Sequence, residues 1–375
     1  MKSQPPTLRQ VAKQANVSVA AISYVLNGKG RISDRKRNHI VRLLQDAGLK
    51  PKYKHRPIFH LCDHRAFSTH GAFAPMVAKY EALNAISHEY EVSLRLEFLH
   101  SPGSGDLAAQ LAELQSYHPG AVVLDSLPPA ECPTIADYFE RRGVPTVQIG
   151  YTVAAPGIDA VVIDDFAGAY EATRHLIGQG HQKIATLRWN IAGDSASPKK
   201  HAGFLCALEE AGLPVRPQYI VESPFKRVED RLTGREAAAK LLTLADPPTA
   251  VFVENSFISA SLLYPSNPSE PALPDAIARL DMVHFEAWDL ELVEQVMTGI
   301  LAYPARRTKL LKIDWSELAK VAAKQLIERM RGQPNTGRII RMAPRLYEVN
   351  GVELRPLTPS ATSATPSMTP MRASE

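Results

Sequence analysis

The sequence has few cysteines and no long apolar run, and each absence argues against a class of protein. Cys62, Cys132 and Cys206 are widely separated and form no C-x-x-C pair, which favours reduced cysteines packed in a core over a disulfide scaffold. No run of about 18 apolar residues is present, so no transmembrane helix is expected. The first residues, MKSQPPTLRQ, lack the apolar core of a secretory signal. We therefore expect a cytoplasmic protein without a membrane partner.

Common catalytic signatures are also missing. The sequence contains no G-x-S-x-G elbow and no H-E-x-x-H motif, and the glycine turn GQGHQKI lacks the Lys-Ser/Thr of a phosphate-binding loop. A group of possible metal ligands comprises His60, Cys62, Asp63, His64 and His70, but they lack the spacing of a common zinc site. The sequence therefore predicts a protein that is not an enzyme and that needs no cofactor or metal.

Positive charge is concentrated near the N-terminus. Residues 1–58 contain 13 Lys/Arg and 2 Asp/Glu, whereas the remaining residues contain 30 Lys/Arg and 37 Asp/Glu. A basic head on a mildly acidic body is typical of a polyanion-binding module joined to a second function. A solvated basic arm is the alternative, but helical patterns run through the basic residues and favour a folded head.

Three helices are predicted within the first fifty residues. The first begins at a capping box, Thr7-Leu8-Arg9-Gln10, and its predicted buried residues are Leu8, Val11, Ala12 and Ala15. The third begins at Ser33-Asp34, and its predicted buried residues are Ile40, Leu43, Leu44 and Ala47. Short helices joined by a tight turn match the helix-turn-helix plan.

The second helix lies in the uncharged stretch VSVAAISYVLNG, residues 17–28. Ser18 is suited to cap its start and Gly28 to end it. Its predicted buried stripe is Val19, Ile22 and Leu26. The opposite face contains small groups and one aromatic ring, which suits a helix that enters a narrow space.

From residue 57 onward, apolar runs of strand length alternate with helical patterns. The predicted strands are PIFHLCD, VSLRLEFL, GAVVLD, VPTVQIG, DAVVIDD, KIATLRW, TAVFVEN and LDMVHFE. Helical patterns include GAYEATRHLIGQG, GREAAAKLLTLA and residues 75–89. This alternation predicts parallel sheets covered on both faces, and the length favours two lobes over one sheet. Residues 356–375 contain eight Ser/Thr and four Pro and are predicted to be disordered.

The stretch TLRQVAKQANVSVAAISYVLNGKGRISDRKRNHIVRLLQDAGLKP resembles the DNA-binding head of the lactose-repressor (LacI/GalR) family of bacterial transcription regulators. Weaker matches, including GFLCALEEAGLPV and PTAVFVENS, continue to about residue 350. The resemblance implies an N-terminal all-α helix-turn-helix head and an α/β two-lobed body like that of periplasmic binding proteins. The predicted divisions are a head at 1–50, an atypical hinge at 51–57, a body at 58–355 and a tail at 356–375.

The resemblance also implies which residues contact DNA. In this family the second helix enters the major groove, so by position Val19 and Ala20 read base edges. Tyr24 stands where the family has Arg in the pattern S-R-V-L-N, and the operator should differ at that base pair. Packing between helices is the alternative role for Tyr24. The residues at or beside the family's phosphate-binding positions are Thr7, Ser18, Asn27, Ser33, Arg35 and Lys36.

Two regions depart from the family pattern. The hinge segment KPKYKHRPIF lacks the leucine that wedges into the minor groove in the family, and we expect it to hold phosphate instead. In the effector site, Lys200 replaces a ligand-binding arginine, Glu286 replaces an aspartate, and Asn255 keeps only half of an N-D pair. Each could instead be an ordinary rim residue. The predicted effector-binding residues are Phe73, Asp165, Trp189, Lys200, Asn255 and Glu286.

These observations predict a repressor that binds double-stranded operator DNA as a homodimer, at the nucleoid when bound, and that responds to a small polar ligand. The expected ligand is a sugar or a sugar derivative, held in the cleft between the lobes. The tail has no leucine heptads of the kind that make the lactose repressor tetrameric. The alternatives are a solute-binding protein, which leaves the basic head unexplained, and a sugar-acting enzyme, which lacks a recognisable catalytic pair.

Overall fold

The computed structural model describes sixteen segments of the chain, and the findings below concern these residues: 7–26, 36, 39–40, 43–44, 56–63, 73–100, 107–128, 130–150, 156–189, 196–223, 233–255, 258–259, 262, 279–285, 308–350 and 353–357. The chain divides into two compact units. Unit 1 comprises Met1–Ile163, Trp288–Leu290 and Asp314–Met342, and unit 2 comprises Asp164–Ala287, Glu291–Ile313 and Ala343–Glu375. Among the described residues, no helix is long and apolar enough to cross a membrane.

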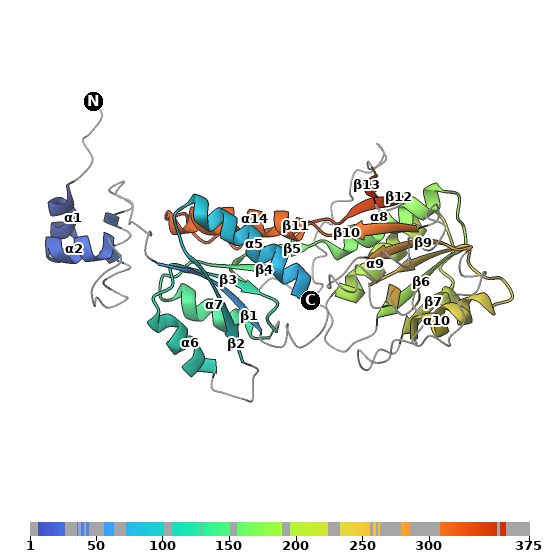
Figure 1. Ribbon diagram of the computed structural model, residues 1–375, viewed down its shortest axis with the longest axis horizontal. Coiled ribbons are helices and arrows are strands. Elements are labelled where there is room, and N and C mark those ends of the chain that lie inside the picture. The colour runs from blue at the N-terminus through green and yellow to red at the C-terminus, as the bar shows by residue number, and fades with distance from the viewer. Residues whose placement is uncertain are drawn as a thin grey trace, which may run out of the picture. The chain divides into compact units, whose positions relative to one another are not determined.

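The head begins with helices α1 (Leu8–Gln14) and α2 (Val19–Leu26), drawn in dark blue in Figure 1. The predicted caps at the starts of these two helices are confirmed. The backbone N–H of Thr7 donates to Gln10 Oε1 at 2.6 Å, and Ser18 Oγ accepts the N–H of Ala21 at 3.1 Å. A small apolar cluster holds the helices together, and its buried members are Val11, Ala12, Ala15, Ile22, Val25, Ile40 and Leu44.

The predicted stripe of α2 is wrong at its first residue. The side chain of Val19 is 42% exposed, whereas Ile22 and Val25 are buried against α1. Successive residues of an α-helix turn by about 100°, so positions 19 and 25 lie about 120° apart around the axis. The face that packs on α1 therefore contains Ile22 and Val25, and Val19, at the start of the helix, faces outward. The side chain of Leu26, the third residue of the predicted stripe, lies outside the described residues, as does Ala47 of the third helix.

Unit 1 is built on a six-stranded, parallel sheet with the order β11-β5-β4-β3-β1-β2. Its strands are β1 (Ile58–Asp63), β2 (Leu94–Leu99), β3 (Ala121–Asp125), β4 (Thr146–Gly150), β5 (Asp159–Ile163) and β11 (Ile339–Met342). β1 is buried along its whole length because it lies inside the sheet with helices on both faces.

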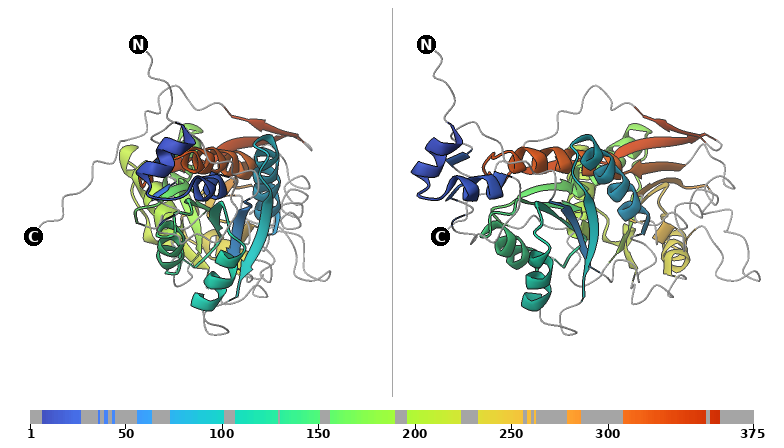
Figure 2. Two further views of the ribbon diagram at one scale, coloured as in Figure 1. Left: turned by 90° about the vertical axis from the view of Figure 1, so that its left-hand side faces the viewer. Right: turned by 60° about the vertical axis from the view of Figure 1, so that its left-hand side comes forward.

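Four helices of the described part of the chain cover this sheet. They are α5 (Phe73–Glu89), α6 (Leu107–Ser116), α7 (Cys132–Glu140) and α14 (Trp315–Met330). Residues of α6 and α7 share an apolar core with Phe59 and Leu61 of β1. The views in Figures 1 and 2 agree that α5 and α14 lie side by side, and the two helices pack directly on each other. Arg329 fastens α14 to the sheet by donating to the carbonyl oxygen of Thr146 at 2.8 Å and to Glu140 at 2.6 Å.

Unit 2 contains a seven-stranded, mixed sheet with the order β13-β12-β10-β9-β8-β6-β7. Its strands are β6 (Ile184–Trp189), β7 (Ile220–Ser223), β8 (Ala250–Val253), β9 (Asp281–Phe285), β10 (Thr308–Lys312), β12 (Arg345–Asn350) and β13 (Glu353–Pro356). β12 and β13 pair antiparallel at one edge, and the other strands run parallel.

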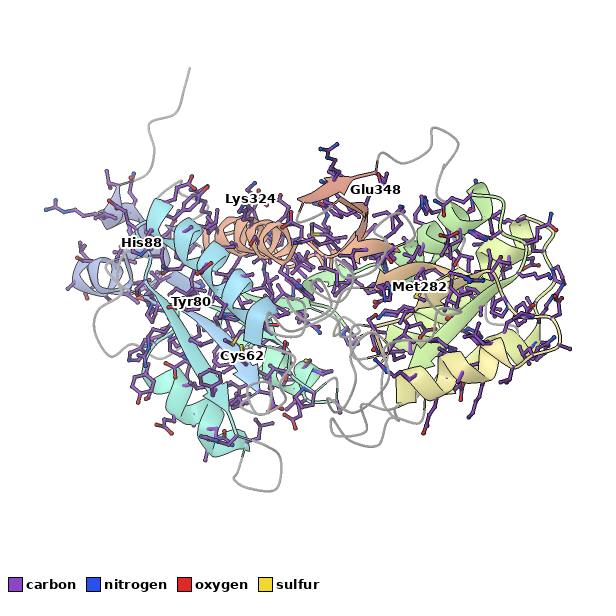
Figure 3. The ribbon with its side chains drawn as sticks, turned by 45° about the vertical axis from the view of Figure 1, so that its right-hand side comes forward. Cys62, Tyr80, His88, Met282, Lys324 and Glu348 are labelled. Atoms are coloured by element: carbon purple, nitrogen blue, oxygen red, sulfur yellow. The ribbon has the colours of Figure 1, made fainter. Side chains whose placement is uncertain are left out.

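The helices of unit 2 lie on opposite faces of its sheet. They are α8 (Asp165–Gly178), α9 (Ala196–Glu210), the 3₁₀ turn η1 (Pro217–Tyr219) and α10 (Thr233–Leu242). α10 shares an apolar core with Val251, Val253 and Met282, and Met282 is labelled on its strand in Figure 3. α8 contacts β8 and β9 and packs extensively on α9.

Helices α8 and α9 approach each other so closely that one position has no room for a side chain. A Cβ atom on Gly203 of α9 would lie 2.3 Å from the carbonyl oxygen of Phe166 and 2.9 Å from the backbone nitrogen of Tyr170. Both atoms belong to the backbone of α8, so they cannot move aside as a flexible side chain would.

We expect Gly203→Ala to lower the free energy of unfolding by at least about 2 kcal/mol, because the added methyl must force the two helices apart. Gly178→Ala, at the end of α8, is the matched control. A Cβ there meets nothing within 4 Å, so this change should be neutral or should stabilise by up to about 1 kcal/mol. Urea unfolding of both variants checks the prediction, and equal stabilities would contradict it.

Candidate functional site

The start of α2 presents small apolar groups to solvent. Val19 and Ala20 are exposed, and the exposed residues Thr7 and Ser18 lie at the starts of the two helices. Both hydroxyls also serve the fold, because Thr7 Oγ1 donates to Gln10 and Ser18 caps α2. Lys36 is exposed as well. The remaining predicted DNA contacts, which are Asn27, Ser33, Arg35 and the side chain of Tyr24, lie outside the described residues.

In unit 2, two of the predicted effector residues meet at the carboxyl ends of the parallel strands. Lys200 of α9 is buried, and its Nζ lies 3.8 Å from Asp165 Oδ1 at the start of α8. The same ammonium donates to the carbonyl oxygen of Glu254 at 3.0 Å and lies 3.9 Å from the centre of the Phe285 ring. Asp164 caps α8 by accepting the N–H of Ala167, which places Asp165 in its first turn.

Asn255 follows Glu254 directly and is also buried. Its Oδ1 accepts the backbone N–H of Ile258 at 3.0 Å, so a ligand contact would fall to the amide nitrogen. Ser259 Oγ donates to the carbonyl oxygen of Asn255 and lies 2.6 Å from His284 Nδ1. Burial lowers the pKa of His284 to about 4, so the ring is neutral and shares a hydrogen bond with the Ser259 hydroxyl through Nδ1.

The other three predicted effector residues cannot be placed beside these. Glu286 and the side chains of Phe73 and Trp189 are outside the described residues, so the structure brings together Asp165, Lys200 and Asn255 of the six. Their role in binding a ligand stays a prediction.

The sequence reading missed a polar network beside Lys200. Glu254, which is fully buried, accepts the hydroxyl of Ser197 at 2.8 Å and lies 3.4 Å from Arg188 Nε. Arg188 also donates to Glu222 at 3.1 Å. The available signal was the position of Arg188, Glu222 and Glu254 at or just after the ends of β6, β7 and β8, where ligands of α/β sheets gather.

Unit 1 contains a separate buried charge cluster. Asp125, at the end of β3, lies 2.5 Å from Lys79 Nζ and 2.8 Å from His60 Nε2, and Ser126 Oγ donates to it at 2.9 Å. Burial alone would raise the pKa of Asp125, but the charge of Lys79 and the contact with His60 hold it well below its usual range. The ammonium of Lys79 also lies 5.1 Å from the centre of the Trp315 ring.

His60, Cys62 and Asp125 lie close enough together to be considered as a metal site, since one ligand atom from each falls within 4.8 Å of the others. Figure 3 labels Cys62 on its strand and Tyr80 on α5, the helix that provides Lys79. The residues do not fit a metal ion well. Lys79 already supplies the positive charge beside Asp125, and burial raises the pKa of the Cys62 thiol well above its usual value.

Comparison with known proteins assigns both parts of the chain. One family model, described as bacterial regulatory proteins of the lacI family, matches residues 7–52. A second, described as periplasmic binding proteins and sugar binding domain of LacI family, matches residues 78–261. The chain belongs to the LacI family of bacterial regulatory proteins. It is therefore a transcription regulator with a helix-turn-helix head, and its relatives are regulators rather than enzymes.

Curated relatives of this LacI-family chain match most of its length. It is similar to the HTH-type transcriptional regulator DegA of Bacillus subtilis, with 25% identity over 280 residues that cover 72% of this chain and 80% of that protein. It is also similar to the HTH-type transcriptional repressor PurR of Yersinia pestis, with 29% identity over 252 residues that cover 66% and 71% of the two chains.

Solved structures of LacI-family proteins confirm the fold. A complex of the transcriptional regulator CelR with cellobiose has a TM-score of 0.58 and 21% identity, covering 91% of this chain and 98% of that one. A lac repressor dimer bound to operator and the anti-inducer ONPF has a TM-score of 0.56 and 16% identity, covering 92% and 98%. The predicted head and two-lobed α/β body are thus confirmed.

The unit 1 cluster generates a prediction about stability. Lys79→Met should lower the free energy of unfolding by about 3–5 kcal/mol near pH 7, because it leaves Asp125 buried without its cation. The double variant Lys79→Met, Asp125→Asn should regain most of that loss, because neither charge then remains. Urea unfolding of both variants checks this. If the double variant is as unstable as the single one, the charge pair is not the cause.

Proposed function

We propose that this chain is a repressor that binds operator DNA through its head and whose DNA affinity is set by a small polar ligand. The observation that supports it best is the outward face of α2, where Val19 and Ala20 are exposed at the start of a capped helix. A helix with small side chains can approach base edges closely, and methyl groups of Val and Ala suit contact with the methyl group of thymine. The basic residues of 1–58 supply the attraction to phosphate.

The assembly and the location are part of the same proposal. We propose a homodimer, because one small head offers few contacts and two heads on a palindrome multiply the specificity. The dimeric lac repressor on its operator, which shares the fold, supports this choice. The site of action is the bacterial cytoplasm, with the protein at the nucleoid when bound to DNA. Base contacts are assigned to Val19, Ala20 and Tyr24.

The first test concerns DNA. The proposed phosphate contacts are Thr7, Ser18, Asn27, Ser33, Arg35 and Lys36. We expect Lys36→Gln to weaken binding to all sequences and to reduce the slope of log affinity against log salt by about one unit. Titration of labelled operator at several salt concentrations measures the slope, and sedimentation of the complex should give two chains per operator. Lys320→Gln, which removes an exposed cation from α14, is the control and should leave the slope unchanged.

Tyr24 should affect sequence preference rather than the salt slope. Tyr24→Arg restores a side chain that can bind guanine through two hydrogen bonds, so the preferred base pair should change by about 1–3 kcal/mol. Selection from random DNA compares the two proteins. The same selected motif from both would remove Tyr24 from the base-reading residues, and an unchanged salt slope in Lys36→Gln would remove Lys36 from the phosphate contacts.

The ligand site is proposed at the carboxyl edge of the unit 2 sheet, around Asp165, Lys200 and Asn255. Buried Lys200 provides an ammonium group there, and Asp165 and Asn255 provide carboxylate and amide groups. Such groups bind sugar hydroxyls, and the complex of CelR with cellobiose shows that this fold can hold a sugar. We therefore propose a sugar or sugar derivative as the ligand. Trp189 and Glu286 complete the proposed set within unit 2, and Phe73, on α5, stays a predicted ligand contact.

The second test identifies the ligand by thermal shift against sugars, sugar acids and nucleosides. A ligand at a hundred times its dissociation constant should add about 2.7 kcal/mol of stability. Lys200→Met should shrink that shift, because it removes the ammonium while keeping an apolar contact with Phe285. Lys199→Met, on the neighbouring and more exposed lysine, is the control. An undiminished shift in Lys200→Met would place the ligand elsewhere.

A further inference from the structure

The network around Glu254 points to the charge of the ligand that the unit 2 site accepts. We propose that Glu254 makes this site reject acidic ligands and select neutral or amino sugars. This inference rests on the ligand site proposed above and names its substrate class.

Arg188 is held between two carboxylates. Its Nε lies 3.4 Å from Glu254 Oε1, and its terminal nitrogen donates to Glu222 Oε1 at 3.1 Å. The Ser197 hydroxyl fixes the other oxygen of Glu254 at 2.8 Å. A guanidinium that already faces two carboxylates has its charge more than compensated, so it offers little attraction to the acid group of a ligand.

Lys200 is balanced in a similar way. Asp165 lies 3.8 Å from its ammonium, and the backbone carbonyl of Glu254 accepts one of its N–H groups at 3.0 Å. Glu254 therefore acts on both cations, on Arg188 through its carboxylate and on Lys200 through its backbone. Around Arg188, the two carboxylates of Glu222 and Glu254 outnumber the one guanidinium.

The carboxylate of Glu254 acts strongly on its surroundings because it is fully buried. Charges interact more strongly inside a protein than in water, so a ligand carboxylate or phosphate close to Glu254 is repelled. A site that repels one class of ligand gains specificity without any new contact to the class it accepts. Hydroxyl groups can still donate to carboxylates and accept from Lys200, and an ammonium group on the sugar would be favoured.

The experiment compares wild type with Glu254→Gln, which keeps the shape of the side chain and removes its charge. The probes are two matched sets, glucose, glucosamine and glucuronate, and galactose, galactosamine and galacturonate, together with inorganic phosphate. Binding is measured by thermal shift and calorimetry. Phosphate and the two uronates should bind Glu254→Gln at least about tenfold more tightly than they bind wild type, because Arg188 then has only Glu222 as partner.

Two further variants separate charge from folding. Glu254→Asp keeps the carboxylate and should continue to reject phosphate and uronates. Glu209→Gln removes one exposed acid from α9 and should leave every affinity unchanged, which controls for net charge. Circular dichroism and the unfolding midpoint without ligand establish that each variant is folded.

The outcomes distinguish this inference from the proposed function. If wild type binds a uronate as tightly as the matched neutral sugar, or binds phosphate as tightly as Glu254→Gln does, the selectivity inference is wrong while the ligand site stands. If no sugar binds either protein, the proposed effector class fails, and the phosphate arm still decides whether Glu254 excludes anions. If Glu254→Gln does not fold, the wild-type comparison of uronate with neutral sugar decides the question.

Discussion

The close crossing of α8 and α9 is the constraint on which the candidate ligand site depends. Gly203 lets the backbone of α9 approach the carbonyl oxygen of Phe166, where even a methyl group does not fit. Lys200 lies one turn before Gly203, and Asp165 directly precedes Phe166, so the same crossing brings their charges to 3.8 Å. A side chain at position 203 would widen this distance before it affected any ligand. Gly203 therefore determines both the packing of α8 on α9 and the distance between Lys200 and Asp165.

The buried charges at the carboxyl edge of the unit 2 sheet are not explained by stability alone. Removing a pair such as Arg188 and Glu254 from water is expensive, and apolar residues of similar size would often stabilise a fold as well or better. In unit 2 the charges that carry this desolvation cost lie at the carboxyl ends of the parallel strands, where ligands of α/β sheets bind. In unit 1, the ion pair of Lys79 and Asp125 joins α5 to the sheet.

The sequence predicted the eight strands named from their apolar runs, because most of them are buried parallel strands that are apolar on both faces. The edge strand β2, with the exposed Arg95, is an exception. It did not include the helices α6, α7 and α14. It also did not include the parallel strands β7, β10 and β11 or the antiparallel pair β12 and β13, whose patterns are shorter or less regular. Asp165, Lys200 and Asn255 came from the family resemblance and from strand ends. Arg188 and Glu254 were missed because strand register brings them together: Leu187 pairs with Val253, so the next residues meet beyond the sheet.

The head shows the same dependence of recognition on packing. α2 has eight residues, fewer than the 12–15 or so that an isolated helix needs for even marginal stability in water. It persists because Ile22 and Val25 are buried against α1. Those residues occupy the face opposite to the one that a groove would meet, and Val19, which the sequence pattern assigned to the core, is instead free to face outward. The short helix α2 can thus present small groups on its outer side only because its other side is held by the apolar core of the head.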